Sequence, residues 1–252
     1  MSIGGCFTCL TRYDTFYEAL EKVFDVRFII PKPKSIDDDV YEIFPENIFV
    51  HVDRELLQDY EAAKEKIFNH CNHDKDLAIL DIGGYFSAII NDIKDDFGEH
   101  FLGIVEDTEN GLQKYESFDG SIKCPIVQVA RSPLKENEDY MVGHAVAFSI
   151  ESILRNLSIL INGRRVGVIG SGKIGKAAAF AMKSKQGSVS IFDQNSVRLV
   201  HAHSHGLNTQ SREDILASSD ILISATGNKA LMGARFCIFE KWLFCRIGNI
   251  VR

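Results

Sequence analysis

The chain has 252 residues, of which 45% are hydrophobic and 25% charged, as in an ordinary soluble globular protein. Its formal net charge of −7 gives no reason to expect nucleic acid or an anionic membrane as a partner. The longest apolar runs are too short to span a bilayer, and no basic region followed by a long apolar core opens the chain. We therefore expect a cytoplasmic protein.

Strand-length apolar runs alternate with helix-length amphipathic segments, a pattern typical of parallel α/β sheets. In the first half the predicted strands cover residues 26–30, 47–52, 77–82, 101–105 and 126–129. Predicted helices cover residues 15–23, 54–69 and 86–97, and the proline- and aspartate-rich segment 31–39 is expected to be a surface loop.

A long helix-compatible stretch, residues 140–162, separates the two halves and contains no proline. After it, predicted strands at 165–169, 189–192, 221–225 and 242–247 alternate with helices. The sequence therefore predicts an α/β protein with two Rossmann-like lobes and mainly parallel sheets. We expect a substrate-type α/β domain over residues 1–144, a bridging helix over 145–161 and a nucleotide-binding domain over 162–252.

A GxGxxG motif formed by Gly170, Gly172 and Gly175 lies between a predicted strand and an alanine-rich helix. The first glycine permits a tight turn, the second lets the backbone approach a diphosphate, and the third lets helix pack on strand. The diphosphate is expected at the positive N-terminus of the helix. A second strand ends at Asp193, eighteen residues after Gly175, where a carboxylate can bind both hydroxyls of an adenosine ribose.

This carboxylate favours NAD over NADP, because it would repel a 2′-phosphate. Gln194 and Asn195 supply no cation, and Arg198 lies several residues further on. The segment SATGN, residues 224–228, ends another strand at the edge where nicotinamide contacts are expected. We therefore predict an NAD-binding Rossmann domain whose cofactor contacts are Gly170, Gly172, Lys173, Ile174, Gly175, Asp193, Thr226, Gly227 and Asn228.

Several further motifs occur in series: LAILDIGGYFS, GIVEDTENGLQKYE, PIVQVARSPLKENEDYMVGHAV, SATGN and CRIGN. Together with the glycine motif they resemble the S-adenosyl-L-homocysteine hydrolase family over roughly residues 77–250. The resemblance implies chemistry in which NAD oxidises a ribose 3′-hydroxyl and a base then removes the neighbouring C4′ proton. Homocysteine is eliminated, water adds, and the hydroxyl is restored.

The resemblance assigns roles to individual residues. Lys135 and Asp139 match the lysine and aspartate near the 3′-hydroxyl, and a desolvated lysine can accept a hydroxyl proton as hydride leaves. Their i and i+4 spacing at a helix start puts them on one face, although taken alone the pair also fits a surface ion pair. Asp107 matches an adenosine-contact position, where it replaces a glutamate, and Thr108 matches a position on the nicotinamide side.

The departures from the family are equally specific. Ile82 replaces a second aspartate, Tyr140 an asparagine and His144 a cysteine, while Arg246 and Asn249 replace an asparagine and a histidine in the last strand. The segment that gives the family its adenine contacts has no match, and the sequence stops before the family's C-terminal arm, so we expect NAD to exchange readily. We expect His144 to act as a substitute base, since histidine exchanges a proton near neutrality, and Asn249 to contact substrate.

The leading hypothesis is an NAD-dependent enzyme, an oxidoreductase or adenosylhomocysteinase-like hydrolase, that performs hydride transfer on a nucleoside-like or small hydroxylated substrate. The alternatives are a non-catalytic nucleotide-binding regulatory relative and a true adenosylhomocysteinase completed by another chain. A homodimer is expected. No metal site is expected, because the Cys6–Cys9 pair, the loop histidines 70 and 73 and the HAHSH segment at 201–205 match no strong zinc pattern.

Overall fold

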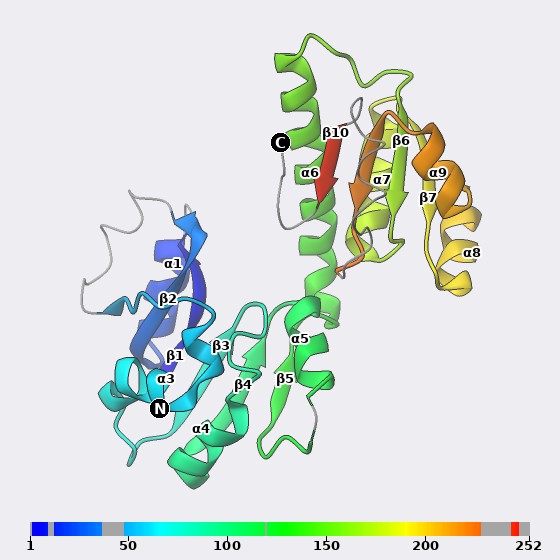
Figure 1. The fold of residues 1–252 in the computed structure, drawn as a ribbon. Coiled ribbons are helices and arrows are strands. Elements are labelled where there is room, and N and C mark those ends of the chain that lie inside the picture. The colour runs from blue at the N-terminus through cyan, green and yellow to red at the C-terminus, as the bar shows by residue number, and fades with distance from the viewer. Residues whose placement is uncertain (1, 10–12, 37–47, 119, 228–242, 247–252) are drawn as a thin grey trace. The chain divides into compact units, whose positions relative to one another are not determined.

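The computed structural model describes residues 2–9, 13–36, 48–118, 120–227 and 243–246 of the chain. It divides into two units, Met1–Ser132 and Pro133–Arg252. Each contains a five-stranded sheet in which every pair of neighbouring strands is parallel. The predicted α/β class with two parallel, Rossmann-like lobes is therefore confirmed (Figure 1). The functional boundaries at residues 144 and 161 stay predictions.

The first sheet has the order β2-β1-β3-β4-β5. Its strands are β1 (Ser2–Cys9), β2 (Asp25–Ile36), β3 (Leu77–Asp81), β4 (Phe101–Glu106) and β5 (Ile126–Gln128). The helices are α1 (Tyr13–Glu21), η2 (Leu56–Gln58), α3 (Tyr60–Lys66), η3 (Phe68–His70), α4 (Ile90–Phe97), η4 (Gly98–His100) and α5 (Glu109–Glu116). Aromatic and branched side chains form a core between one face of this sheet and the helices α3, η3 and α4. On the other face of the sheet, α1 packs through Tyr17 and Leu20.

Three predictions in this unit are wrong, and one of them is the single helix over 54–69, which the structure divides into η2, α3 and η3. In the predicted strand at 47–52, the described residues 48–52 make only an isolated bridge, between Phe49 and Ile29. The chain then turns into η2, where the Asp53 carboxylate accepts a hydrogen bond from the Leu56 backbone. The predicted loop at 31–39 is strand as far as Ile36. Its prolines are tolerated because β2 lies at the edge of the sheet, where a missing N–H breaks no central ladder.

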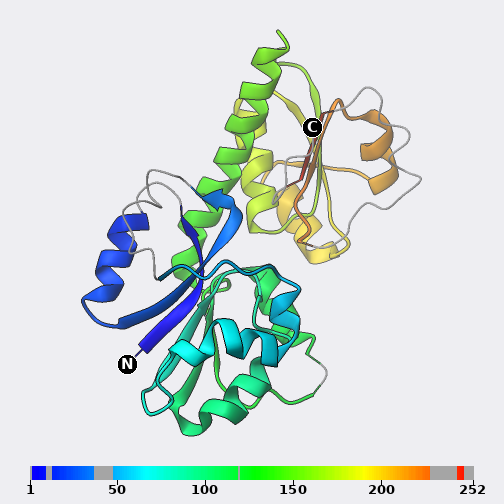
Figure 2. The same cartoon turned by 60° about the vertical axis from the view of Figure 1, so that its left-hand side comes forward.

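The second sheet has the order β10-β9-β6-β7-β8, the arrangement of a dinucleotide-binding Rossmann fold. Its strands are β6 (Arg165–Ile169), β7 (Ser188–Phe192), β8 (Asn208–Thr209), β9 (Ile221–Ser224) and β10 (Leu243–Arg246). The helical elements are η5 (Pro133–Lys135), α6 (Glu136–Asn156), α7 (Lys173–Ser184), α8 (Ser196–Ser204) and α9 (Arg212–Ser218). Figure 2 shows the long helix α6 beside α7 within this unit.

The two faces of the second sheet are covered differently. Val166 and Val168 of β6 pack with side chains from α6, α7 and α8, whereas Ile169 packs with Ile215 of α9 on the opposite face. This alternation follows from the two-residue period of a strand. The order of strands reverses between β6 and β9, so the loops after these two strands flank the crevice in which such sheets bind ligands.

Candidate functional site: a glycine loop and an acid–base pair in the second unit

The glycine loop follows β6 at the point where the strand order reverses. Gly170 has a φ of +105°, a left-handed conformation that disfavours any side chain. A Cβ there would lie 2.7 Å from the Ala225 carbonyl oxygen and 3.0 Å from the Thr226 backbone nitrogen, so the loop runs directly beside the end of β9. A Cβ at Gly175 would overlap the Gly170 carbonyl oxygen. These two glycines are therefore required by close packing.

Gly172 differs from the other two glycines of the motif. It is the N-cap of α7 in an extended conformation, and a Cβ there would meet nothing within 4 Å. No side chain caps the first N–H groups of α7, whereas Asn195 caps α8 and Ser211 caps α9. An open approach to uncapped N–H groups at a helix N-terminus suits the diphosphate of a dinucleotide. The residues present therefore fit the cofactor that the sequence predicts.

Asp193 lies just after β7 and has 11% of its side chain exposed. Its Oδ2 accepts a hydrogen bond of 2.6 Å from the Ser171 backbone, and its Oδ1 one of 2.8 Å from the Asn195 backbone. Each carboxylate oxygen keeps a second lone pair that a ribose hydroxyl can use. The Arg198 guanidinium lies 3.9 Å from Oδ2, closer than its separation in sequence suggests.

Of the predicted acid–base residues, Asp139 lies near the glycine loop, and Lys135 lies one helical turn before it in the same unit. Lys135 is buried, with 9% exposed, and its ammonium lies 2.6 Å from Glu138. Asp139 has 14% of its side chain exposed, and its Oδ2 lies 3.7 Å from Nζ of Lys173, the first residue of α7. In the described part of the chain this Oδ2 is buried without a hydrogen-bond partner. Burial raises the pKa of Asp139, against the opposing charges of Lys173 and Lys135.

The face of α6 that carries Asp139 also carries Gly143, whose Cβ would overlap the Ala177 side chain of α7. This close approach of the two helices holds Asp139 beside Lys173. His144 lies on a neighbouring stripe and is partly buried, with its ring 4.3 Å from the Tyr140 ring. The structure therefore brings Asp139 to the glycine loop and pairs His144 with Tyr140.

At the predicted nicotinamide side, Thr226 is partly buried and Gly227 is exposed with a φ of +70°. Ile174 is partly buried in the first turn of α7. The predicted contacts Asn228 and Asn249 lie outside the described residues, as do the side chains of Cys6 and Cys9. The described residues contain no group of three or more histidine, cysteine, aspartate or glutamate side chains that could hold a metal ion.

Asp107 and Thr108 lie in the first unit, after β4. Thr108 caps α5 through its hydroxyl, which accepts a hydrogen bond from Gly111 and donates one of 2.7 Å to Glu106. The Asp107 side chain is partly buried, and its backbone donates to the Asp81 carbonyl. Their predicted contacts with nicotinamide and substrate stay predictions.

A buried carboxylate pair in the first unit is a feature that the predicted site residues did not include. Asp81 and Glu106 end β3 and β4, and neither is exposed. Glu106 accepts hydrogen bonds from the backbones of Gly83 and Gly84, at 3.0 Å each. Asp81 accepts one of 2.6 Å from the Tyr115 hydroxyl. In the sequence, the signal for this pair is a carboxylate at the end of each apolar strand.

Burial raises the pKa of Asp81, and burial together with the charge of Asp81 raises the pKa of Glu106. Burial and the neighbouring Asp81 also raise the pKa of Tyr115. The Gly-Gly turn after β3 is thus held by a carboxylate from the next strand, while its Gly83 carbonyl accepts from the Lys114 ammonium. The arrangement fixes the loops at the carboxyl ends of β3 and β4, the edge where parallel sheets bind ligands.

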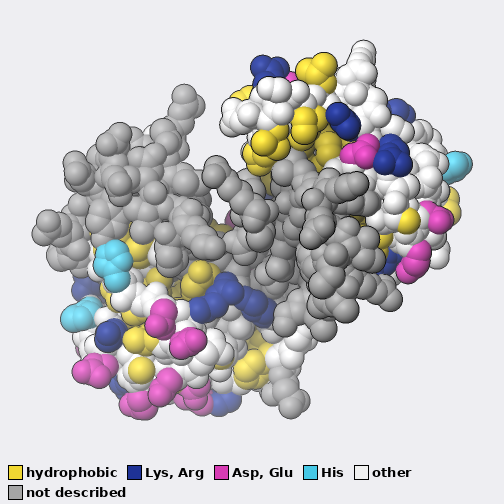
Figure 3. All heavy atoms as spheres, turned by 45° about the horizontal axis from the view of Figure 1, so that its top comes forward, with side chains coloured by type: hydrophobic (Ala, Val, Ile, Leu, Met, Phe, Trp, Pro, Cys, Tyr) yellow, Lys and Arg dark blue, Asp and Glu magenta, His cyan; other side chains and the backbone are white. Residues whose placement is uncertain are grey.

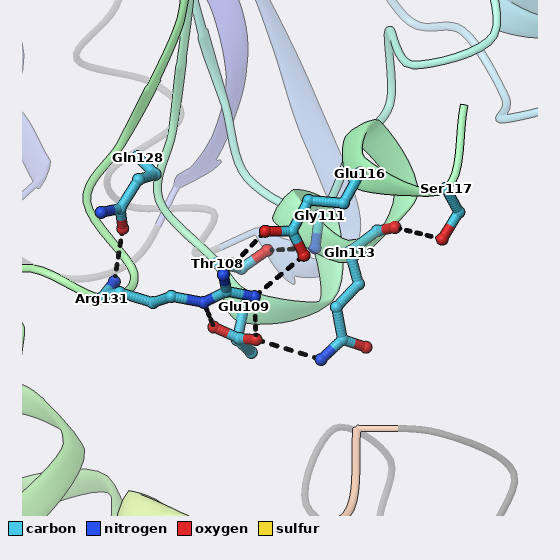
Figure 4. A network of polar contacts seen from close by, with 8 residues as sticks. All are labelled: Thr108, Glu109, Gly111, Gln113, Glu116, Ser117, Gln128 and Arg131. Atoms are coloured by element: carbon cyan, nitrogen blue, oxygen red, sulfur yellow. Dashed lines mark hydrogen bonds and ion pairs between the residues drawn. The ribbon is translucent and has the colours of Figure 1, made fainter. Parts of the chain in front are cut away.

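Arg131 ties the segment after β5 to α5 (Figure 4). Its guanidinium donates to both oxygens of Glu109 at 3.0 and 2.8 Å and to both oxygens of Glu116 at 2.7 and 3.0 Å. Its backbone N–H donates to the Gln128 side chain at 2.8 Å. One planar guanidinium thereby binds two carboxylates from the two ends of one helix, a geometry that lysine cannot reproduce.

Comparisons with known proteins agree with this geometry. Residues 140–250 match the family model of the S-adenosyl-L-homocysteine hydrolase NAD-binding domain. An adenosylhomocysteinase from Acinetobacter baylyi is 29% identical over 166 residues, which cover 60% of this chain and 35% of that protein. The chain thus matches about a third of the length of this relative.

Two solved structures are similar to this chain at low sequence identity. A protein from Polaromonas sp. JS6 66, described as a D-isomer specific 2-hydroxyacid dehydrogenase, NAD-binding, superposes with a TM-score of 0.50 at 14% identity, covering 90% of this chain and 65% of that one. A phosphoglycerate oxidoreductase from Vibrio cholerae O395 gives a TM-score of 0.48 at 14% identity, covering 89% and 66%. The second unit is an NAD-binding Rossmann domain, and over residues 140–250 it is similar to the NAD-binding domain of the S-adenosyl-L-homocysteine hydrolases.

Proposed function

We propose that this protein is an NAD-dependent enzyme that transfers hydride from a secondary alcohol of a nucleoside-like or other small hydroxylated substrate. The observation that carries the proposal is the position of Asp139. Its buried carboxylate lies 3.7 Å from Nζ of Lys173, the first residue of α7 after the glycine loop, and belongs to the same unit. A carboxylate held beside a dinucleotide site is a suitable member of an acid–base pair.

In the proposed reaction the alcohol loses a hydride from carbon and a proton from oxygen, and a ketone results. Bound NAD would supply the hydride acceptor. Lys135, buried at the start of α6, would take the hydroxyl proton, and Asp139 would stabilise the charge that results, since it lies one helical turn away. We propose His144 as a second base. Asp107 and Asn249 are proposed substrate contacts, and Thr108 a proposed cofactor contact.

A mixture of protein, NAD and a candidate alcohol tests the reaction through the absorbance of the reduced nicotinamide at about 340 nm. We expect reduction with adenosine or S-adenosylhomocysteine in the wild-type protein. Lys135→Ala and Asp139→Asn should abolish the signal while NAD still binds, as calorimetry would show. Retained turnover in both variants would remove the pair from the reaction.

A second function is favoured by one contact. The Lys135 ammonium lies 2.6 Å from Glu138, an exposed residue, and is thus engaged in an ion pair. This fits a non-catalytic relative that uses NAD binding for regulation, as does Ile82 in place of the family's second aspartate. Clear NAD binding without reduction by any nucleoside would support this alternative. Complete hydrolase activity only after addition of another chain would support the third, an adenosylhomocysteinase completed in trans.

The cytoplasmic location and the homodimer belong to the same proposal. In the described residues no helix is long and apolar enough to cross a membrane. The surface of the second unit exposes hydrophobic side chains (Figure 3), and on α6 Met141 and Phe148 are 65% and 69% exposed. Such side chains are a suitable surface for self-association. Light scattering after gel filtration tests it, and a monomer at micromolar concentration would contradict it.

A further inference from the structure

Lys173 lies between the glycine loop and the proposed acid–base pair of Lys135 and Asp139. It is the first residue of α7, directly after the open glycine Gly172, and 42% of its side chain is exposed. Its ammonium lies 3.7 Å from Oδ2 of Asp139, beyond the distance of a direct hydrogen bond. A long, flexible lysine side chain held this loosely can change partner at little cost.

Three charged side chains act most strongly on Asp139 among the described residues. They are Lys173 from α7 and, from its own side, Lys135 and Glu138, which are paired with each other. Its Oδ2 is buried without a hydrogen bond. Lys173 is therefore the cation whose movement would change the charge balance at Asp139 most.

We propose that Lys173 is a positioning residue that couples NAD binding to the protonation of Asp139. In the free protein Lys173 faces the Asp139 carboxylate. A diphosphate at the N-terminus of α7 places negative charge beside the same ammonium, and Lys173 turns to it. Asp139 then loses its cation and takes up a proton more readily. The inference concerns NAD binding alone, so it stands or falls separately from the proposed hydride transfer.

The coupling has a definite sign. Protonation of Asp139 releases Lys173, so NAD should bind more tightly as the pH falls through the titration of Asp139. By reciprocity, NAD binding should take up a fraction of a proton. Neutral residues at either position should abolish both effects, because the competition for Lys173 then disappears.

Calorimetric titration with NAD at several pH values tests the proposal by a double-mutant cycle. Asp139→Asn should raise the affinity for NAD about fivefold in the wild-type background and less than about twofold when combined with Lys173→Met. Lys173→Met should weaken NAD binding and remove its pH dependence, and Lys173→Arg should restore both. Lys176→Met is the matched control, because it removes the same charge one turn along α7, where the ammonium faces His201 at 3.3 Å.

If Asp139→Asn changes the affinity for NAD by the same factor with and without Lys173→Met, its effect is a general charge effect and the coupling is overturned. Equal losses in Lys173→Met and Lys176→Met would also overturn it. If Asp139→Asn does not fold, the pH dependence of NAD affinity in the wild type and in Lys173→Met still decides, since neither protein alters Asp139. Thermal unfolding without NAD verifies that each variant is folded.

Discussion

The backbone N–H of Ser171, in the glycine loop, donates a 2.6 Å hydrogen bond to Oδ2 of Asp193, at the end of the neighbouring strand. The loop that approaches the diphosphate and the carboxylate that binds the ribose are thus joined by a charge-assisted bond before NAD arrives. Since Asn195 holds the other oxygen of Asp193, the carboxylate is fixed in orientation. Preorganisation of this kind lowers the entropic cost of binding the dinucleotide.

We expect Asp193→Ser to change the choice of cofactor. The serine removes the negative charge that repels a 2′-phosphate, and Arg198, 3.9 Å from Oδ2 in the wild type, becomes available to it. Affinity for NAD should fall by roughly tenfold or more, because hydrogen bonds to a charged group are lost, while affinity for NADP should rise. Calorimetry with both cofactors measures the two changes. Adding Arg198→Ala should remove the gain for NADP, and an unchanged NAD-to-NADP ratio in Asp193→Ser would refute this account of selectivity.

The glycine loop offers a matched pair of alanine variants. At Gly172 the backbone is extended and a Cβ meets nothing, so Gly172→Ala should fold normally but obstruct the approaching diphosphate. Its melting temperature without NAD should equal that of the wild type, and the increase caused by NAD should be lost. At Gly175 a Cβ overlaps the Gly170 carbonyl, so Gly175→Ala should lower stability by about 1–3 kcal/mol.

Differential scanning fluorimetry with and without NAD separates the two effects. The expectation for Gly172 fails if its alanine variant retains the full thermal shift with NAD. That for Gly175 fails if its alanine variant melts like the wild type.

The sequence predicted the second unit better than the first for a physical reason. The contacts of a glycine turn, a strand end and a helix start are local, so the motif at 170–175 and Asp193 were sufficient to find the cofactor loop. The proximity of Lys173 to Asp139 depends on how α6 packs on α7 at Gly143, which no periodicity reveals. Arg198 lies several residues after Asp193 in the sequence, but the first turn of α8 brings its guanidinium to 3.9 Å from Oδ2 of Asp193.

In the first unit the errors have similar causes. The run at 47–52 has the composition of a strand, but a strand also needs a partner, and only Phe49 pairs with β2. A single helix was predicted over 54–69, whereas the Asp59 side chain caps a new helix at Tyr60. Asp81 and Glu106 were visible as strand-end carboxylates, but their hydrogen bonds depend on the register of β3 with β4.

Replacing Arg131 should show how much its planar guanidinium contributes to the stability of the folded protein. Lysine keeps the charge but cannot bind Glu109 and Glu116 through four hydrogen bonds. Because Arg131 is 46% exposed, we expect Arg131→Lys to cost only about 0.5–1 kcal/mol at low salt. Urea unfolding at low and high ionic strength measures the loss of stability in Arg131→Lys and in Arg131→Met. Added salt should reduce the loss more in Arg131→Met, because methionine removes the charge that lysine keeps. A loss independent of salt and equal in both variants would indicate packing of the side-chain stem instead.

The buried pair of Asp81 and Glu106 should make stability fall with rising pH. Both carboxyls have a pKa raised in the folded state, by burial and, for Glu106, by the charge of Asp81. A raised carboxyl pKa means that the folded state binds more protons than the unfolded state, so its contribution to stability is present below the unfolded pKa of about 4 and is lost as pH rises through the folded pKa. Exposed pairs such as Asp220 with Arg165, where the ion pair lowers the carboxyl pKa, act in the opposite direction and at lower pH.

Asp81→Asn tests this sign, because the amide has the shape of the carboxyl but does not ionise. Its free energy of unfolding should decline less steeply than that of the wild type when the pH rises above about 4. Tyr115→Phe is the control: it removes the 2.6 Å hydrogen bond to Asp81 without removing the charge. It should lower stability by about 1–3 kcal/mol and keep the decline. Urea unfolding at a series of pH values gives both quantities, and an unaltered slope in Asp81→Asn would show that the pair does not set the pH dependence.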